Sequence, residues 1–109
     1  MGDLVSRRCS ACTPQTPKVS AEQADRFLGE LPGFARDGAV AAITKTFKFE
    51  NYYETMAFVN AVAFIAHRED HHPDLEVHYG SCKVTYSTHA VKGLSENDFI
   101  CAAKVNALV

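Results

Sequence analysis

A helical pattern that lies between two hairpin patterns constrains the fold of this chain more than any other feature. Residues 51–70 begin with an asparagine cap and then carry apolar residues over a wide arc of a helix. The flanking segments alternate apolar and polar residues around two turn signals, Asp37-Gly38 and Gly80-Ser81. We expect the helix to cover one face of a sheet built from both hairpins, with apolar surface left over for a second subunit.

The other segments extend this order at both ends. Helical spacing over 20–31 starts from a Ser20-x-x-Gln23 capping box and stops at Pro32-Gly33. A last helix starts at Ser95, with Asp98 as the acidic residue of its capping box. The strand candidates are 34–36, 39–49, 75–79 and 82–88. The expected fold is α+β, a single domain with a four-stranded, largely antiparallel sheet, helices packed on one face and the order α-β-β-α-β-β-α.

Residues 1–17 contain two prolines and no apolar period, so we expect a flexible N-terminal segment before a domain that spans 18–109. Cys9 and Cys12 have CxxC spacing within this segment. Such a pair can be half of a zinc site, a redox pair or two free thiols. The remaining cysteines, Cys82 and Cys101, supply no second CxxC, which favours free thiols.

Composition and charge exclude several classes of partner. The chain has 109 residues, 47% of them hydrophobic, and a formal net charge of −2, without the basic surface that nucleic-acid binding needs. No apolar run reaches the ~20 residues of a membrane-spanning helix, and no secretory signal is present. The first residues match a short myristoylation pattern but lack the second signal that stable anchoring needs. We expect a cytoplasmic protein with no nucleic-acid or membrane partner.

The chemistry-bearing residues are concentrated in 67–98, which holds all five histidines. An imidazole, with an ordinary pKa of about 6.5, exchanges protons in the physiological range, so convergent histidines can give and take protons within one reaction. If the second hairpin pairs around its turn, Pro73 and His89 lie at the same end of it. This spacing predicts that His71, His72 and His89 converge.

The residues alone leave three simpler interpretations open. The histidine pair can be a solvated turn. His67 and His71 share a helix face as HxxxH, so with His89 they can form a metal site, although no general base stands where an HExxH motif places it. Asp98 can be a capping carboxylate and nothing more. His78 alternates to the outward face of its strand.

Taken together, these residues resemble the pterin-4a-carbinolamine dehydratases. The resemblance lies in a histidine pair before proline, an aromatic residue six positions later, a histidine ten positions further and a following aspartate: His71-His72-Pro73, Tyr79, His89 and Asp98. Three further segments are also similar to the family, namely Phe47-Lys48-Phe49, Ser87-Thr88-His89 and Gly93-Leu94-Ser95. The similarity covers about residues 18–108.

The resemblance implies a lyase that removes water from 4a-hydroxytetrahydropterin to give quinonoid dihydropterin, in the recycling of tetrahydrobiopterin for aromatic amino-acid hydroxylases. It implies no metal or organic cofactor, and a homodimer or homotetramer. The catalytic residues it implies are His71, His72, His89 and Asp98. The pterin-binding residues it implies are His71, His72, Pro73, Thr88, His89, Ala90 and Val91.

We hypothesise that His71 and His89 form the main acid–base pair, that His72 positions the hydroxyl group or assists the proton transfer, and that Asp98 holds or polarises His89 while capping its helix. Two positions depart from the family, since His67 replaces a frequent glutamate and Phe34 a usual tryptophan.

The resemblance also implies a function of another class. Family members act as dimerisation cofactors of a transcription factor, with a nuclear location, or as assembly factors, through their helical surface. The intact histidine set favours the enzyme.

Overall fold

Two hairpins join edge to edge in a computed structural model that describes residues 3–38 and 41–109. Every neighbouring pair of strands is antiparallel, in the spatial order β1-β2-β4-β3. The central pair is β2 with β4, in register from Ile43 opposite Tyr86 to Lys48 opposite Ser81. The strand bounds are β1 Ala35–Asp37, β2 Ala42–Lys48, β3 Asp74–His78 and β4 Ser81–Tyr86. The predicted four-stranded antiparallel sheet is confirmed.

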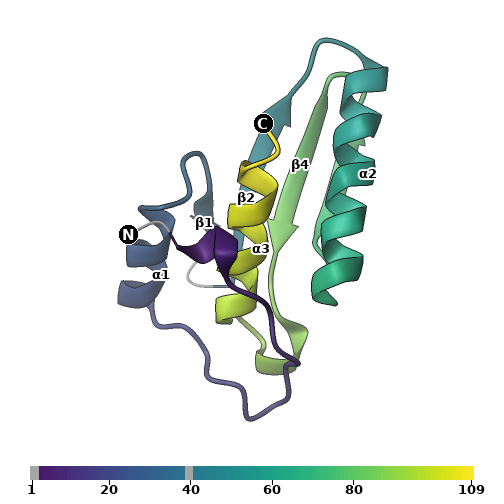
Figure 1. The fold of residues 1–109 in the computed structure, drawn as a ribbon. Helices are drawn as coiled ribbons and strands as arrows, with labels where there is room; N and C mark the ends of the chain where they lie inside the picture. The colour runs from purple at the N-terminus through teal and green to yellow at the C-terminus, as the bar shows by residue number, and fades with distance from the viewer. Residues whose placement is uncertain (1–2, 39–40) are drawn as a thin grey trace.

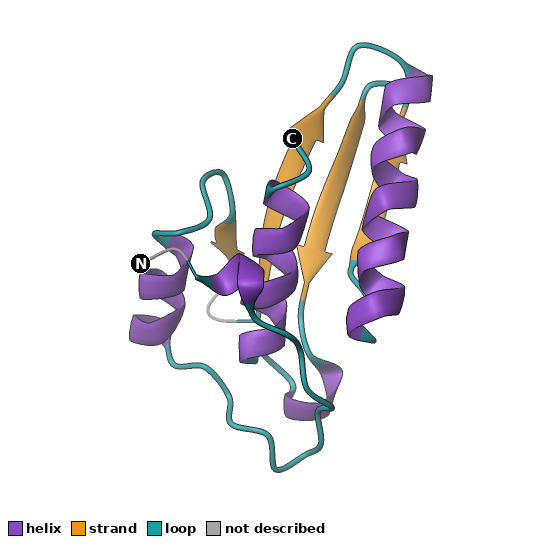
Figure 2. Cartoon of the chain, viewed as in Figure 1, coloured by secondary structure: helices purple, strands orange, loops and turns teal. Residues whose placement is uncertain are grey.

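The described residues also form three α-helices and two short 3-10 helices, and the helices lie around the sheet as Figure 1 shows. Helices α2 and α3 contact each other and lie on the same side of the sheet, with α2 over β3 and β4 (Figure 2). Helix α1 stands beside the β1 end of the sheet. The bounds are η1 Leu4–Ser6, α1 Ala21–Leu28, α2 Tyr52–Glu69, η2 His89–Val91 and α3 Glu96–Asn106. The predicted order of helices and strands is confirmed, with η1 and η2 added.

Side-chain caps start all three α-helices at the predicted residues. The Ser20 hydroxyl accepts a hydrogen bond from the Gln23 N–H, and the Asn51 side chain accepts one from the Glu54 N–H. At α3 the capping box is reciprocal, since the Asp98 carboxylate also accepts the Ser95 N–H. These side chains satisfy N–H groups that a helix leaves without partners in its first turn, each for typically about 1 kcal/mol.

The core lies between the sheet and the helices that cover it. Alternate residues of β4, Cys82, Val84 and Tyr86, are fully buried against the helices, whereas Lys83 and Thr85 point to the uncovered face. Four aromatic rings from β2, α2 and the flanking loops pack with centroids 4.6–6.2 Å apart: Phe34, Phe47, Phe49 and Phe58. Phe34 thus fills a core position, as expected for a substituted tryptophan.

The buried side of α2 agrees in part with its apolar pattern. The sequence predicts a stripe of Met56, Val59, Ala63 and Ala66 that is extended by Phe58, Val62 and Ile65. Phe58 and Val62 are buried, whereas Ala63 is exposed. The other buried residues of the helix are Thr55 and Glu69. Because the helix is apolar on nearly all sides, its periodicity could not determine which line faces the sheet.

Several element ends also differ. Helix α1 ends at Leu28, three residues early, yet Leu31 is still buried by the turn that follows. Strand β4 ends at Tyr86 because Thr88 leaves the ladder and bridges to Gly93. The predicted strand start at residue 39 lies outside the described residues.

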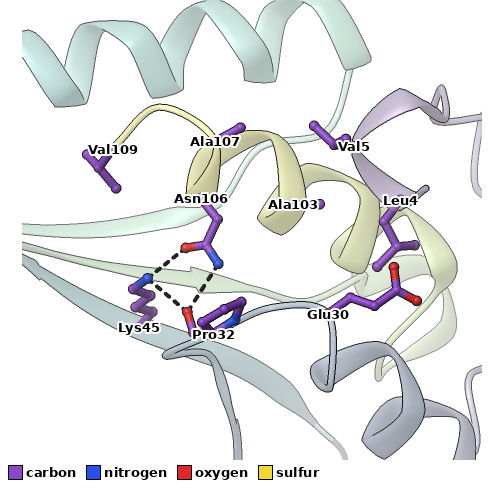
Figure 3. Close-up of a pocket in the computed structure, with 9 residues that line it drawn as sticks. All are labelled: Leu4, Val5, Glu30, Pro32, Lys45, Ala103, Asn106, Ala107 and Val109. Carbon is purple, nitrogen blue, oxygen red and sulfur yellow. Dashed lines mark hydrogen bonds between the residues drawn. The ribbon is translucent and has the colours of Figure 1, made fainter. Parts of the chain in front are cut away.

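Lys45 lies on the same face of β2 as Ile43 and Phe47, and its long side chain carries the amine to polar partners. Its amine lies 4.5 Å from the centre of the Phe47 ring and donates to the Pro32 carbonyl (2.9 Å) and the Asn106 side-chain oxygen (2.7 Å) (Figure 3). Burial lowers the pKa of Lys45.

The N-terminal segment contacts the domain along residues 3–17. Leu4 is buried in the core, η1 packs on α3, and the Lys104 amine donates to the Val5 carbonyl (2.7 Å). The predicted flexibility of residues 1–17 stays a prediction, but this segment has more partners than its composition indicates. Over the described ranges, no helix has the length and apolar character that a membrane span requires.

Candidate functional site

The end of α2 places His71. Asp70 closes the helix in the left-handed conformation (φ 53°), and the His71 N–H returns to the Ala66 carbonyl (3.1 Å). The following Pro73 prevents any continuation of the helix. This reversal turns the His71 side chain toward β4 and α3, where only 11% of it is exposed.

His71 is held on two sides. Its Nε2 lies 2.7 Å from Oδ1 of Asp98, whose side chain is completely buried. Its ring also stacks on that of Tyr86, with centroids 6.0 Å apart and planes 7° from parallel. Because a carboxylate only accepts hydrogen bonds, Nε2 of neutral His71 carries the proton. Nδ1 is then a free acceptor, since no described residue donates a hydrogen bond to it.

Asp98 is fixed by a small network at the start of α3. Its second oxygen accepts from the Thr88 hydroxyl (2.7 Å) and from the Ser95 N–H (2.9 Å). Thr88 and Ser95 also share a hydrogen bond of 2.8 Å. Asp98 was expected to hold or polarise His89; among the described residues its carboxylate instead binds His71, Thr88 and Ser95 and has no hydrogen bond to His89. Asp98 is a cap and a histidine partner at once.

His89 reaches the same region on a short connection of its own. The Thr88 N–H donates to the Gly93 carbonyl (2.8 Å) and the Gly93 N–H donates back to Thr88 (3.3 Å), which closes the turn around η2. Lys92 permits this turn by adopting a positive φ of 53°. His89, the first residue of η2, is exposed, as is His72.

A hollow of about 160 Å³ brings most of the predicted site together. Residues from three segments line it: Cys12, Asp70, His71, His72, Ser87, Thr88, His89 and Ala90. The predicted Pro73 and Val91 are absent from this lining, and Val91, the last residue of η2, is buried. The predicted site did not include three of the lining residues, Cys12, Asp70 and Ser87. The CxxC spacing had singled out Cys12, but nothing in the sequence connected it to the histidines.

The other two histidines lie away from the hollow. His78 is exposed on β3 beside Glu76, with the ring nitrogen 3.6 Å from the carboxylate, and His67 is exposed on the last turn of α2. Within 3–38 and 41–109 there is no group of three or more His, Cys, Asp or Glu side chains arranged to hold a metal ion. The predicted convergence is therefore limited to His71, His72 and His89.

Three larger hollows lie elsewhere, and no histidine lines them. One of about 410 Å³ is lined mainly by apolar residues around Lys45 and Asn106 (Figure 3). A second, about 430 Å³, lies between the N-terminal segment and the starts of α1 and α3. The third, about 370 Å³, lies between α2 and the C-terminal residues. Volume alone would favour these three. Proton transfer at neutral pH is the chemistry of imidazoles, and of these four hollows only the smallest is lined by histidines.

Two buried ionisable groups flank the site. Burial raises the pKa of the Tyr86 phenol, and its hydroxyl has no hydrogen-bond partner in the described part of the chain. Burial alone would raise the pKa of Glu69 as well. However, the Cys9 N–H (2.9 Å), the Arg8 guanidinium (3.0 Å) and Lys104 outweigh that effect and lower the Glu69 pKa. Glu69 therefore joins the N-terminal segment to the end of α2.

Comparison with known proteins identifies the family of this chain. The family description "Pterin 4 alpha carbinolamine dehydratase" matches residues 17–108. A relative from Nitrosospira multiformis, named "Putative pterin-4-alpha-carbinolamine dehydratase", is 53% identical over 97% of this chain and 92% of its own. A relative of the same name from Xylella fastidiosa is 50% identical over 99% of this chain and 96% of its own.

Two solved structures share the fold. The crystal structure of a transcriptional coactivator/pterin dehydratase from Brucella melitensis has a TM-score of 0.81 and 30% identity, over 84% of this chain and 98% of that one. A pterin dehydratase-like protein identified as a RuBisCO assembly factor in the alpha-carboxysome has a TM-score of 0.61 and 25% identity, over 70% of this chain and 88% of that one. The sequence match over nearly the whole domain decides the assignment: the chain belongs to the pterin 4 alpha carbinolamine dehydratase family.

Proposed function

We propose that this chain dehydrates 4a-hydroxytetrahydropterin by histidine acid–base catalysis. The observation that carries the proposal is the buried Asp98–His71 pair at a hollow that His72 and His89 also line. A carboxylate that orients one imidazole beside two exposed ones is an arrangement suited to moving protons. Family membership supports the pterin as the molecule acted on.

The reaction needs one proton delivered and one removed. The C4a–O bond breaks as its hydroxyl group is protonated and leaves as water, while N5 loses its proton and its electron pair forms the C4a=N5 bond. We assign the removal to Nδ1 of His71, because Asp98 fixes the proton on Nε2. His89 delivers the proton from the exposed side, and His72 positions the hydroxyl group. Each such transfer typically contributes about 10²–10⁴-fold to the rate.

The hollow is smaller than the roughly 300–1,000 Å³ of most small-molecule sites. A pterin bound there would keep part of its surface outside, against the exposed His72 and His89. The proposal includes no metal or organic cofactor. It includes a cytoplasmic role in tetrahydrobiopterin recycling, coupled to an aromatic amino-acid hydroxylase that supplies the substrate.

The test is single and double replacement of His71 and His89 by alanine, with pterin dehydration followed by stopped-flow absorbance. We expect the double variant to remain folded and to lose at least about 10²-fold in rate. His78→Ala is the matched control, because His78 is exposed on β3 and away from the hollow. Wild-type rates in the double variant would show that the histidines are not the catalysts.

A second candidate function, protein binding through the helical surface, is favoured by one observation. The outward side of α2 exposes large apolar side chains, with Tyr53 83% and Phe64 62% exposed. Such a surface suits a homodimer or homotetramer, or a partner that the protein helps to assemble. Phe64→Ser should lower the oligomeric mass in light scattering if this surface joins copies. If neither the wild-type protein nor its His89→Ala variant turned over pterin, the binding function would be favoured over the enzyme.

A further inference from the structure

The N-terminal segment is attached at a defined place although it precedes the family-matched region, which begins at residue 17. The Cys9 N–H donates to the buried Glu69 carboxylate (2.9 Å). The next residue, Ser10, exchanges two hydrogen bonds with the buried Asn97 side chain, of 3.2 and 2.6 Å. The backbone is therefore held on both sides of the Cys9 thiol, over the first turns of α3.

This attachment brings two distant thiols into contact. The Cys9 sulfur lies 3.5 Å from the sulfur of Cys101 on α3, 92 residues away in sequence. Neither cysteine is in a disulfide. Cys9 is half-buried, whereas Cys101 is completely buried. A disulfide would require the two sulfurs to move from 3.5 Å to the S–S bond length of about 2.05 Å.

We propose that Cys9 and Cys101 are a site of reversible disulfide formation, oxidised by a peroxide, that fastens the N-terminal segment to α3. The inference does not depend on the proposed dehydratase activity. The disulfide would also affect the histidine-lined hollow, because Cys12 lies three residues after Cys9 and lines that hollow. Oxidation would keep this wall of the site in place.

The order of the chemistry follows from the burial of the two residues, since Cys9 is half-buried and Cys101 completely buried. The sulfur of the less buried residue, Cys9, attacks the peroxide O–O bond and becomes a sulfenic acid, with one water released. The Cys101 sulfur then attacks Cys9, the S–O bond breaks, and the departing hydroxide takes the Cys101 proton to form a second water. Two thiols are oxidised and one peroxide is reduced. The hydrogen bond to Cys9 and burial together raise the pKa of Cys101, which keeps it protonated until Cys9 has reacted.

The test treats the full chain with hydrogen peroxide, blocks remaining thiols and digests the protein with trypsin without reductant. Cleavage after Arg8, Lys18, Lys92 and Lys104 releases peptides 9–18 and 93–104. We expect these two peptides to be disulfide-linked, to separate on reduction, and to come from a protein that runs as a monomer on a non-reducing denaturing gel. Oxidation should also raise the Tm, because the link constrains the unfolded chain.

Matched variants identify the sulfurs, since peptide 9–18 holds both Cys9 and Cys12. Cys12→Ser should keep the link and the rise in Tm, and Cys9→Ser should lose both. Any other product overturns the proposal, whether a bond within peptide 9–18, a link between two copies, an overoxidised but unlinked Cys9, or unreacted thiols.

Discussion

Replacing Asp98 by asparagine should separate the two roles of this residue. The side chain keeps its shape, so one oxygen can still accept from Thr88 and from the Ser95 N–H, as the carboxylate does at 2.7 and 2.9 Å. The amide group then faces Nε2 of His71, where a carboxylate oxygen lay at 2.7 Å. Since an amide NH₂ only donates, Nε2 must become the acceptor and the His71 proton moves to Nδ1.

The structure sets the size of both effects. Of three hydrogen bonds to a completely buried charge, two persist with a neutral acceptor and the third reverses its direction. A hydrogen bond to a charged group contributes about 1.5–3 kcal/mol, so we expect a loss of about that size in the free energy of unfolding. With Nδ1 protonated, His71 cannot remove the N5 proton, and the rate should fall by about 10²–10⁴-fold.

The measurements are urea unfolding and stopped-flow dehydration on the same preparations. Glu96→Gln is the matched control, because Glu96 lies on the same turn of α3 but is exposed and pairs with Arg7 outside the hollow. We expect it to change the free energy of unfolding by about 1 kcal/mol or less and to leave the rate unchanged. A folded Asp98→Asn protein within twofold of the wild-type rate would refute the assigned roles of Asp98 and His71.

Two further substitutions test the surroundings of the site. Glu69→Gln should lower the free energy of unfolding by about 1–3 kcal/mol at neutral pH. Because folding lowers the Glu69 pKa from 4.5, this difference should shrink as the pH falls below that value, and a pH-independent difference in urea titrations would contradict the reasoning. Tyr86→Phe should leave stability unchanged or raise it by about 1 kcal/mol in thermal unfolding, because it removes a buried hydroxyl that lacks a partner among the described residues. A loss above about 1 kcal/mol would show that the hydroxyl has a partner after all.

Most of the fold could be predicted because its signals are local. The capping residues Ser20, Asn51 and Ser95 each start a helix, and they do so with side-chain bonds to the next turn. The hairpin turns and the alternation of β4 are equally local. The facing line of α2 was not predictable in this way, since burial of Thr55 and exposure of Ala63 depend on which surface the sheet presents.

The site shows the same division between local and distant information. That His71, His72 and His89 share one hollow followed from hairpin pairing, which places both ends of the β3–β4 unit together. The contribution of Cys12 depended on a segment whose anchors, Glu69 and Asn97, lie far along the chain. The sequence of the N-terminal segment therefore does not indicate that Glu69 and Asn97 are its partners.

The choice of partner for Asp98 shows why sequence distance misleads at such a site. Asp98 is closer in sequence to His89 than to His71, and all three residues belong to the same motif. However, the capping box fixes the carboxylate inside the first turn of α3, where it is completely buried. Only a side chain that also enters the core can reach it. The reversal at Asp70 turns His71 inward beneath Tyr86, while η2 leaves His89 in solvent. The two histidines therefore differ in environment, because the ring of His71 is hydrogen-bonded to a buried carboxylate whereas His89 lies in solvent.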